Sequence, residues 1–249
     1  MPWSALGGGP GPERTCEVGT VIALARFQVE GYVRSLRVLH PVIVVALVMV
    51  LVLFQGPGGP ERVKLSVGTF GDVAAFMFPI WAWTARALLD TQPDEQRALS
   101  ATAARHRWTP TWAGLIAAYA VNLFLGVIVL AIPVFQGLEA GAPGRAILAG
   151  CTLSVPVALA GTLLGAWTSR AFIPDPGVSL LALLGGVTAV LLLGLGRLSF
   201  LSVPMIEWLR VAHDGPGRFV ADFPGLVLHL ALWSAVVCAA YVFVARLRH

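Results

Sequence analysis

Three polar side chains interrupt long apolar runs of this sequence: Asp72 in GTFGDVAAF, and Tyr119 and Asn122, which stand three residues apart. An ionisable carboxylate inside an apolar run is a candidate for binding a cation or relaying a proton. The alternative for Asp72 is a solvated carboxylate at the outer end of its run. On a helix, Tyr119 and Asn122 share a face, where they either line a transport pathway or make hydrogen bonds to a neighbouring helix.

The motifs of common catalytic and nucleotide-binding sites do not occur. The sequence contains no GxSxG, SxxK or HExxH motif, its five histidines have no metal-binding spacing, and its three cysteines lie far apart. Lys64 is the sole lysine and has no preceding glycine, which excludes a P-loop. We therefore expect no catalytic residue, metal or cofactor in this chain, and no nucleic-acid binding.

The composition is that of an integral membrane protein. Of 249 residues, 57% are hydrophobic, and the mean hydropathy is +0.80. A helix needs about 20 apolar residues to cross a bilayer. Six runs approach this length, at residues 41–54, 69–89, 112–135, 146–167, 178–196 and 225–245. The sequence predicts one all-α domain of six transmembrane helices over residues 21–249. Residues 1–20 lack the apolar core of a signal peptide and are predicted to be a disordered cytoplasmic tail.

The arginines predict the orientation of this domain. Eleven fall in the N-terminal region, the second and fourth loops and the C-terminus, whereas the other loops hold six Lys and Arg residues. Basic loops are retained on the cytoplasmic side. We expect a multi-pass protein of the cell (inner, cytoplasmic) membrane with both termini in the cytoplasm.

A narrow polar stripe precedes the first predicted span. It consists of Arg26, Glu30, Arg34 and Arg37, at steps of four, four and three, in an otherwise apolar segment from residue 21 to 39. This pattern is typical of a helix that lies in the membrane interface before the chain turns inward. A simple extension of the first span is the alternative.

Charge is concentrated in DEQRALSATAARHR, residues 94–107, between the second and third spans. Acidic residues stand at one end, where a helix dipole favours them, and basic residues at the other. A small-residue run separates them, which predicts a short helix over about residues 90–107 that docks onto a partner, or else a solvated loop helix. The residues expected to make the contact are Asp94, Glu95, Arg97, Leu99, Arg105 and Arg107.

Two further segments bear on packing and function. In residues 146–167, Gly150, Ser154, Ala158, Thr162 and Ala166 recur at every fourth position, which predicts close packing within the bundle or at a subunit interface. The segment FLSVPMIEWLRV, residues 200–211, is too short and too interrupted to span. It is predicted to be a re-entrant or interfacial helix that contains Trp208.

An interfacial elbow helix, six spans, a charged helix after span two and a long outer segment before the last span resemble the permease subunits of type 2 ABC exporters. The resemblance implies that residues 94–107 form the coupling helix, which docks onto a separate ABC ATPase subunit that holds ATP and Mg. It also implies a second permease copy, in a homodimer or heterodimer, and an exit gate near Trp208. The apolar spans favour a hydrophobic or amphipathic substrate, such as a drug, an antibiotic or a lipid. Alternatives are a proton-coupled secondary transporter that uses Asp72, a membrane-embedded enzyme, and an assembly factor that does not transport.

Overall fold

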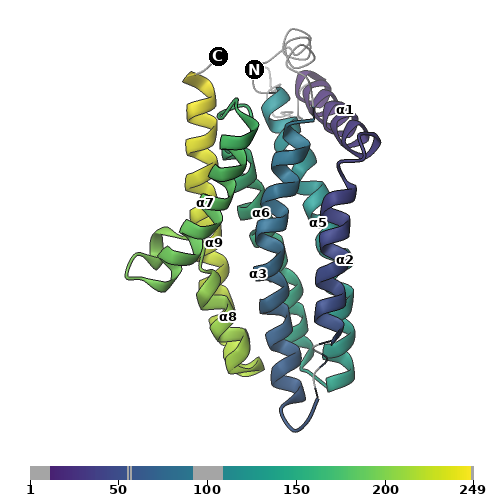
Figure 1. The fold of residues 1–249 in the computed structure, drawn as a ribbon, viewed down its shortest axis with the longest axis vertical. Helices are drawn as coiled ribbons and strands as arrows, with labels where there is room; N and C mark the ends of the chain where they lie inside the picture. The colour runs from purple at the N-terminus through teal and green to yellow at the C-terminus, as the bar shows by residue number, and fades with distance from the viewer. Residues whose placement is uncertain (1–11, 55, 57, 92–108, 248–249) are drawn as a thin grey trace, which may run out of the picture.

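The structure, a computed structural model, describes residues 12–54, 56, 58–91 and 109–247, and within these ranges it is all-α (Figure 1). The helices are α1 (Pro12–Arg34), α2 (Leu39–Phe54), α3 (Arg62–Leu89), α5 (Thr109–Ala140), α6 (Gly144–Trp167), α7 (Pro176–Leu195), the short 3-10 helix η1 (Ser199–Leu201), α8 (Met205–Asp214) and α9 (Pro216–Leu247). Figure 1 shows α1 and the last turns of α9 at one end of the bundle, which we call the α1 end.

In the part of the chain that the structure describes, five helices are long and apolar enough to cross a membrane: α3, α5, α6, α7 and α9. Helix α2 has 16 residues and is about 24 Å long, which is less than the ~30 Å hydrocarbon core. It follows α1 after a bend of 76°, and the bent pair makes a sixth span only if the two are counted as one. The predicted multi-pass, all-helical architecture is thereby confirmed with five to six spans.

Helix α3 is at the centre of the bundle, and its largest interface is with α6. The small residues of α6 make this contact possible. A side-chain carbon at Gly161 would lie 2.9 Å from Cβ of Trp81, and one at Gly165 would lie 2.2 Å from the carbonyl oxygen of Ala82. All five members of the predicted small-residue stripe, Gly150, Ser154, Ala158, Thr162 and Ala166, are likewise buried within the bundle, which is the first of the two predicted roles.

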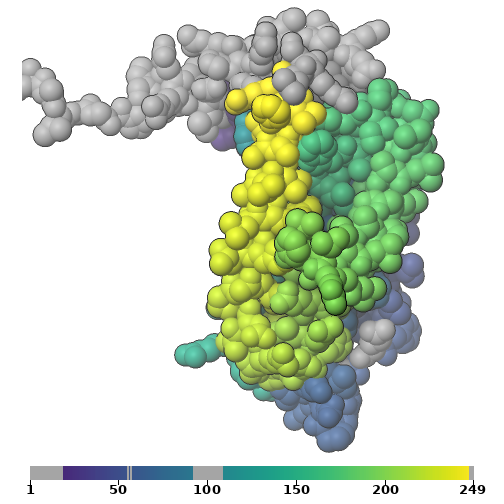
Figure 2. All heavy atoms as spheres, turned by 90° about the vertical axis from the view of Figure 1, so that its left-hand side faces the viewer, coloured from purple at the N-terminus to yellow at the C-terminus, as the bar shows by residue number. Residues whose placement is uncertain are grey.

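The helices around this centre expose apolar faces. Leu47 of α2, Leu181 of α7 and Val236 of α9 are all more than two-thirds exposed. Figure 2 shows α9 in yellow along one face, beside the green atoms of α7 and α8. Exposed aliphatic surface of this kind is suited to contact with lipid tails, where a helix satisfies its own backbone hydrogen bonds.

Several helices extend beyond the predicted spans. Helix α3 begins at Arg62, and α9 begins at Pro216. Their first turns contain charged residues, Arg62 and Lys64 in α3 and Arg218 in α9, which lower the hydropathy without interrupting the backbone hydrogen bonds of the helix. Helix α1 begins at Pro12, so residues 12–20, predicted to be disordered, are helical; proline is favoured in the first turn of a helix.

A break in the helical structure separates α7 from α8. Gly196 is extended, and the hydroxyl of Ser202 donates to the carbonyl of Val190 at 2.9 Å. The indole N–H of Trp233, in the middle of α9, donates to the carbonyl of Leu201 at 3.0 Å. The break therefore lies level with the middle of α9, and α8 runs from there to the end opposite α1 (Figure 1).

Candidate functional site

The most connected polar site among the described residues surrounds Asp90, the residue that ends α3 at the α1 end. Its carboxylate lies 3.8 Å from the guanidinium of Arg86, one turn earlier. The same carboxylate accepts the backbone N–H of Arg170, in the loop after α6, at 2.8 Å. The side chains of Arg86 and Asp90 are only 12% and 9% exposed. Charges buried to this extent require partners, because an unpaired one is strongly destabilising.

Arg86 and Arg37 connect this site to two further elements. The Arg86 guanidinium donates to the carbonyl of Pro176 at 3.0 Å and to the hydroxyl of Ser179, both in the first turn of α7. Arg37, in the turn between α1 and α2, donates to the carbonyl oxygen of Asp90 at 3.1 Å. We call Arg37, Arg86, Asp90, Arg170 and Ser179 the Asp90 junction. It joins the end of α3 to the start of α7, the loop after α6 and the turn before α2.

The polar stripe predicted for residues 21–39 is divided by the end of α1. Arg26 and Glu30 form an exposed ion pair of 3.1 Å, and Arg34 is exposed in the last turn. The helix does not continue to residue 39, because Leu36 has a φ of +57° that an α-helix cannot accommodate. Arg37 consequently leaves the stripe and joins the Asp90 junction.

The opposite face of α1 is packed. Tyr32 is fully buried, and Ala25 lies with it in a cluster that includes Ala113 and Ala117 of α5. Gly114 of α5 lies beside this contact: a side-chain carbon there would be in ordinary contact with Gln28 of α1 at 3.4 Å, but only 2.8 Å from Cδ2 of Leu89 in α3. Helix α1 is therefore held against the α1 end of the bundle.

The predicted coupling-helix residues, Asp94, Glu95, Arg97, Leu99, Arg105 and Arg107, lie outside the described residues. On the described side, the segment follows Thr91, whose hydroxyl donates to the carbonyl of Ala87 in α3 at 2.8 Å. Asp90 and Thr91 are thus the last described residues before it.

At the opposite end, Asp72 pairs with a residue that the sequence did not single out. Its carboxylate lies 2.9 Å from Nε2 of His213 in α8, and the two side chains are 27% and 46% exposed. Gly68 provides the space, because a side-chain carbon there would lie 2.7 Å from the histidine ring. Trp208 lies in the same α3–α8 interface, fully buried, with its backbone against Gly71.

Tyr119 and Asn122 both hydrogen-bond across helices. The Tyr119 hydroxyl donates to the carbonyl of Val155 at 3.2 Å. Asn122 is fully buried, and its amide donates to the carbonyl of Trp81 at 3.0 Å and to the hydroxyl of Thr162 at 2.9 Å. These are the interhelical bonds considered as the alternative to a pathway.

Sequence reasoning missed Asp90, Arg86, Arg170, Ser179 and His213. Each is an ordinary polar residue near a helix end, and only their approach in space distinguishes them. The described residues contain no group of three or more His, Cys, Asp or Glu side chains placed to hold a metal ion. Comparison with known proteins finds no match: no family model, curated protein or solved structure is significantly similar to this chain.

Proposed function

We propose that this chain is the membrane-spanning permease subunit of an ATP-driven exporter, as its resemblance to type 2 ABC permeases implies. In this proposal both termini are cytoplasmic, α1 is the elbow helix in the cytoplasmic interface, and residues 94–107 dock onto a separate ATPase subunit that binds ATP and Mg. A second permease copy completes the transporter. The substrate is hydrophobic or amphipathic.

The observation that best supports the proposal is the Asp90 junction. The segment that would dock onto the ATPase leaves α3 next to a nearly buried ion pair that also contacts the first turn of α7. Movement of the segment would therefore act on α3 and α7 together, and through Arg37 on the turn before α2. Residues of a packed polar junction move together, because separating them would leave buried charges without partners, which is strongly unfavourable.

Such coupling would give transport its direction. Closure of the ATPase subunits would push on the docked segment and change the relative stability of inward-open and outward-open states. Transport requires that the substrate bind the inward-open state more tightly than the outward-open state. The α3–α8 interface near Trp208 is the corresponding candidate for the outer gate.

Co-purification tests the proposal directly. The tagged chain is extracted from its host in mild detergent, and stoichiometric companions are identified by mass spectrometry. We expect an ATPase subunit with a Walker A motif, and we expect it to be lost from the triple variant Asp94→Ala, Glu95→Ala, Arg97→Ala.

A matched control uses three charged residues at the other end of the bundle. Glu61, Arg62 and Lys64 are exposed there, and their triple alanine variant should keep the ATPase. If no ATPase accompanies the intact chain under several mild conditions, or if both triple variants retain it equally, the proposed docking is wrong.

A proton-coupled secondary transporter is the second candidate, and the Asp72–His213 pair favours it. A carboxylate and an imidazole 2.9 Å apart between two helices can exchange a proton as the helices separate. This reading predicts a proton-gradient-dependent flux in vesicles without ATP that Asp72→Asn abolishes. Flux that needs ATP and tolerates Asp72→Asn would exclude it.

A further inference from the structure

A groove opens between α5 and α6 on the surface of the bundle. It has a volume of about 370 Å³ and is lined by Trp81 of α3, by residues of α5 between 123 and 134, and by Cys151, Ser154 and Val155 of α6. Small residues contribute to its lining from both helices, Gly126 and Ala131 on α5 and Cys151 and Ser154 on α6. We call it the α5–α6 groove. Its volume is within the range of small-molecule sites, ~300–1,000 Å³.

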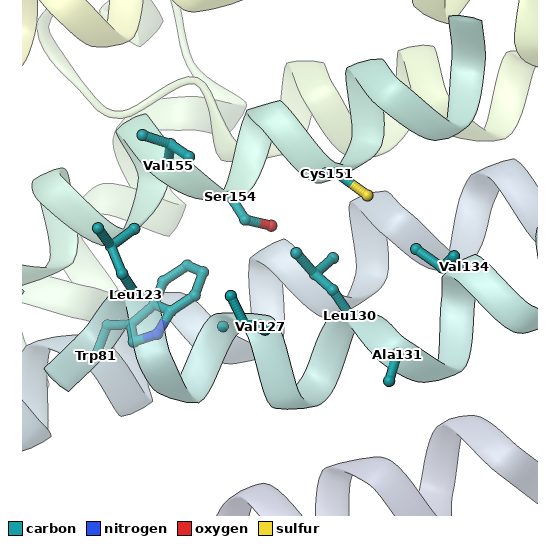
Figure 3. A pocket seen from close by; sticks show the side chains of 10 residues that line it. Trp81, Leu123, Val127, Leu130, Ala131, Val134, Cys151, Ser154 and Val155 are labelled. Carbon is teal, nitrogen blue, oxygen red and sulfur yellow. The ribbon is translucent and has the colours of Figure 1, made fainter. Parts of the chain in front are cut away.

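Two members of the lining have a buried polar atom without a hydrogen-bond partner among the described residues: the indole nitrogen of Trp81 and the hydroxyl of Ser154. Ser154 is 4% exposed. Serines within helices usually donate to a backbone carbonyl one turn earlier, as Thr152 and Thr162 of the same helix do. Figure 3 shows the Ser154 oxygen and the Cys151 sulfur directed from α6 toward the α5 side of the groove. A buried hydroxyl without a partner is costly, and a ligand with an acceptor would remove that cost.

The position of Ser154 along α6 limits the chemistry of the ligand. It lies ten residues, or about 15 Å, from Gly144 and thirteen residues, or about 20 Å, from Trp167. A hydroxyl at this level is near the middle of a hydrocarbon core ~30 Å thick. Phospholipid ester groups lie at the edge of that core and do not reach it, and acyl chains have no acceptor to offer. The acceptor must therefore belong to a molecule that is itself dissolved in the membrane.

We propose that the α5–α6 groove binds a small apolar molecule taken up from the bilayer, and that a carbonyl or similar acceptor on this molecule receives the hydrogen bond of Ser154. Val127 and Val155 at the rim are exposed to the surroundings of the bundle, so entry is lateral. The Tyr119 hydroxyl, bonded to the carbonyl of Val155, holds the two helices together at the end of the groove nearer α1. This inference goes beyond the proposed function, since binding from lipid needs neither an ATPase nor a second copy.

Photolabelling with benzophenone tests this site. The full chain is reconstituted in phosphatidylcholine and phosphatidylglycerol nanodiscs, irradiated with the ketone, and mapped by peptide mass spectrometry. We expect labels concentrated in residues 123–134 and 151–155. Fluorenone should compete more strongly than fluorene, which has the same shape without the carbonyl.

Three variants complete the test. Ser154→Ala removes the donor without filling the groove, and should weaken labelling roughly three- to tenfold, as expected for one hydrogen bond within a membrane. Cys151→Phe should abolish labelling by filling the groove. Leu148→Phe adds the same ring on the exposed face of α6 outside the lining, and should leave labelling unchanged.

The results that would overturn the proposal are equally specific. Labels spread over the exposed faces of α2, α7 and α9 would indicate simple partition into lipid. Equal competition by fluorene and fluorenone, or full labelling of Ser154→Ala, would show that the groove holds any apolar molecule, an acyl chain included. Because none of these measurements involves an ATPase, their outcome is independent of the co-purification experiment.

Discussion

The close contact between α3 and α6 predicts that Gly165→Ala lowers the stability of the bundle. The added carbon would lie 2.2 Å from the carbonyl oxygen of Ala82 and 2.9 Å from Cβ of Ala85. Neither atom is the end of a flexible side chain, so the clash is relieved only by separating two helices along the largest interface of the bundle. Close packing in membranes depends on this approach, because lipid supplies no hydrophobic drive for helix association.

The size of the effect follows from two opposed terms. Overpacking costs about 1–3 kcal/mol, or more where the backbone must move, whereas replacing glycine by alanine within a helix gains up to about 1 kcal/mol. Gly185, in α7, has no heavy atom within 4 Å of the position of an added carbon, so Gly185→Ala has only the gain. Because both variants have the gain, they should differ by the overpacking cost alone, which is about 3 kcal/mol where the backbone must move and corresponds to roughly 6–12 °C in Tm.

The assay is thermal unfolding in detergent, followed by fluorescence-detected size exclusion. Gly150→Ala should lie between the other two variants: rotation of the Phe70 side chain relieves the contacts of the added carbon with Cγ and Cδ1 at 2.4 Å, whereas the contact with Cβ at 2.8 Å remains. If Gly165→Ala were as stable as Gly185→Ala, the close α3–α6 approach would be wrong.

Three further predictions concern polar contacts and use the same assay unless stated. Asp90→Ala should lower stability by about 2–3 kcal/mol, because it removes the counter-charge of a nearly buried arginine, whereas Asp222→Ala, in an exposed ion pair, should cost less than about 1 kcal/mol. Asn122→Leu should cost no more than about 1–2 kcal/mol, as interhelical hydrogen bonds in membranes are individually weak. His213→Ala should remove the only side-chain bond described between α8 and Asp72, and should raise amide hydrogen exchange in α8 relative to α6.

Each of these predictions has a clear contrary result. Equal effects of Asp90→Ala and Asp222→Ala would mean that the Asp90 junction does not stabilise the bundle. A loss of stability above about 3 kcal/mol for Asn122→Leu would show that Asn122 stabilises the bundle by more than its two hydrogen bonds explain. Unchanged amide hydrogen exchange in α8 after His213→Ala would show that the Asp72–His213 contact does not stabilise this helix, and that apolar packing such as that of Trp208 does.

The sequence was sufficient for the all-helical, multi-pass class of the fold because the membrane imposes a simple length rule. Any run of about 20 apolar residues must satisfy its own backbone hydrogen bonds in lipid, and a helix is the way to do so within one segment. The predicted runs correspond to α2, α3, α5, α6, α7 and α9. Spacing was also sufficient for the small-residue stripe of α6, since every fourth residue of a helix falls on one face.

The tertiary structure decided which residues meet. Asp72 and His213 are separated by 141 positions, and Arg86 and Ser179 by 93. Such pairs depend on how far each helix is rotated and shifted against its neighbours, which the summed packing of many apolar side chains determines and no local pattern encodes. The same holds for the unpartnered hydroxyl of Ser154: its spacing predicted a small residue at a packed helix contact, and only the tertiary structure places it in the lining of the α5–α6 groove.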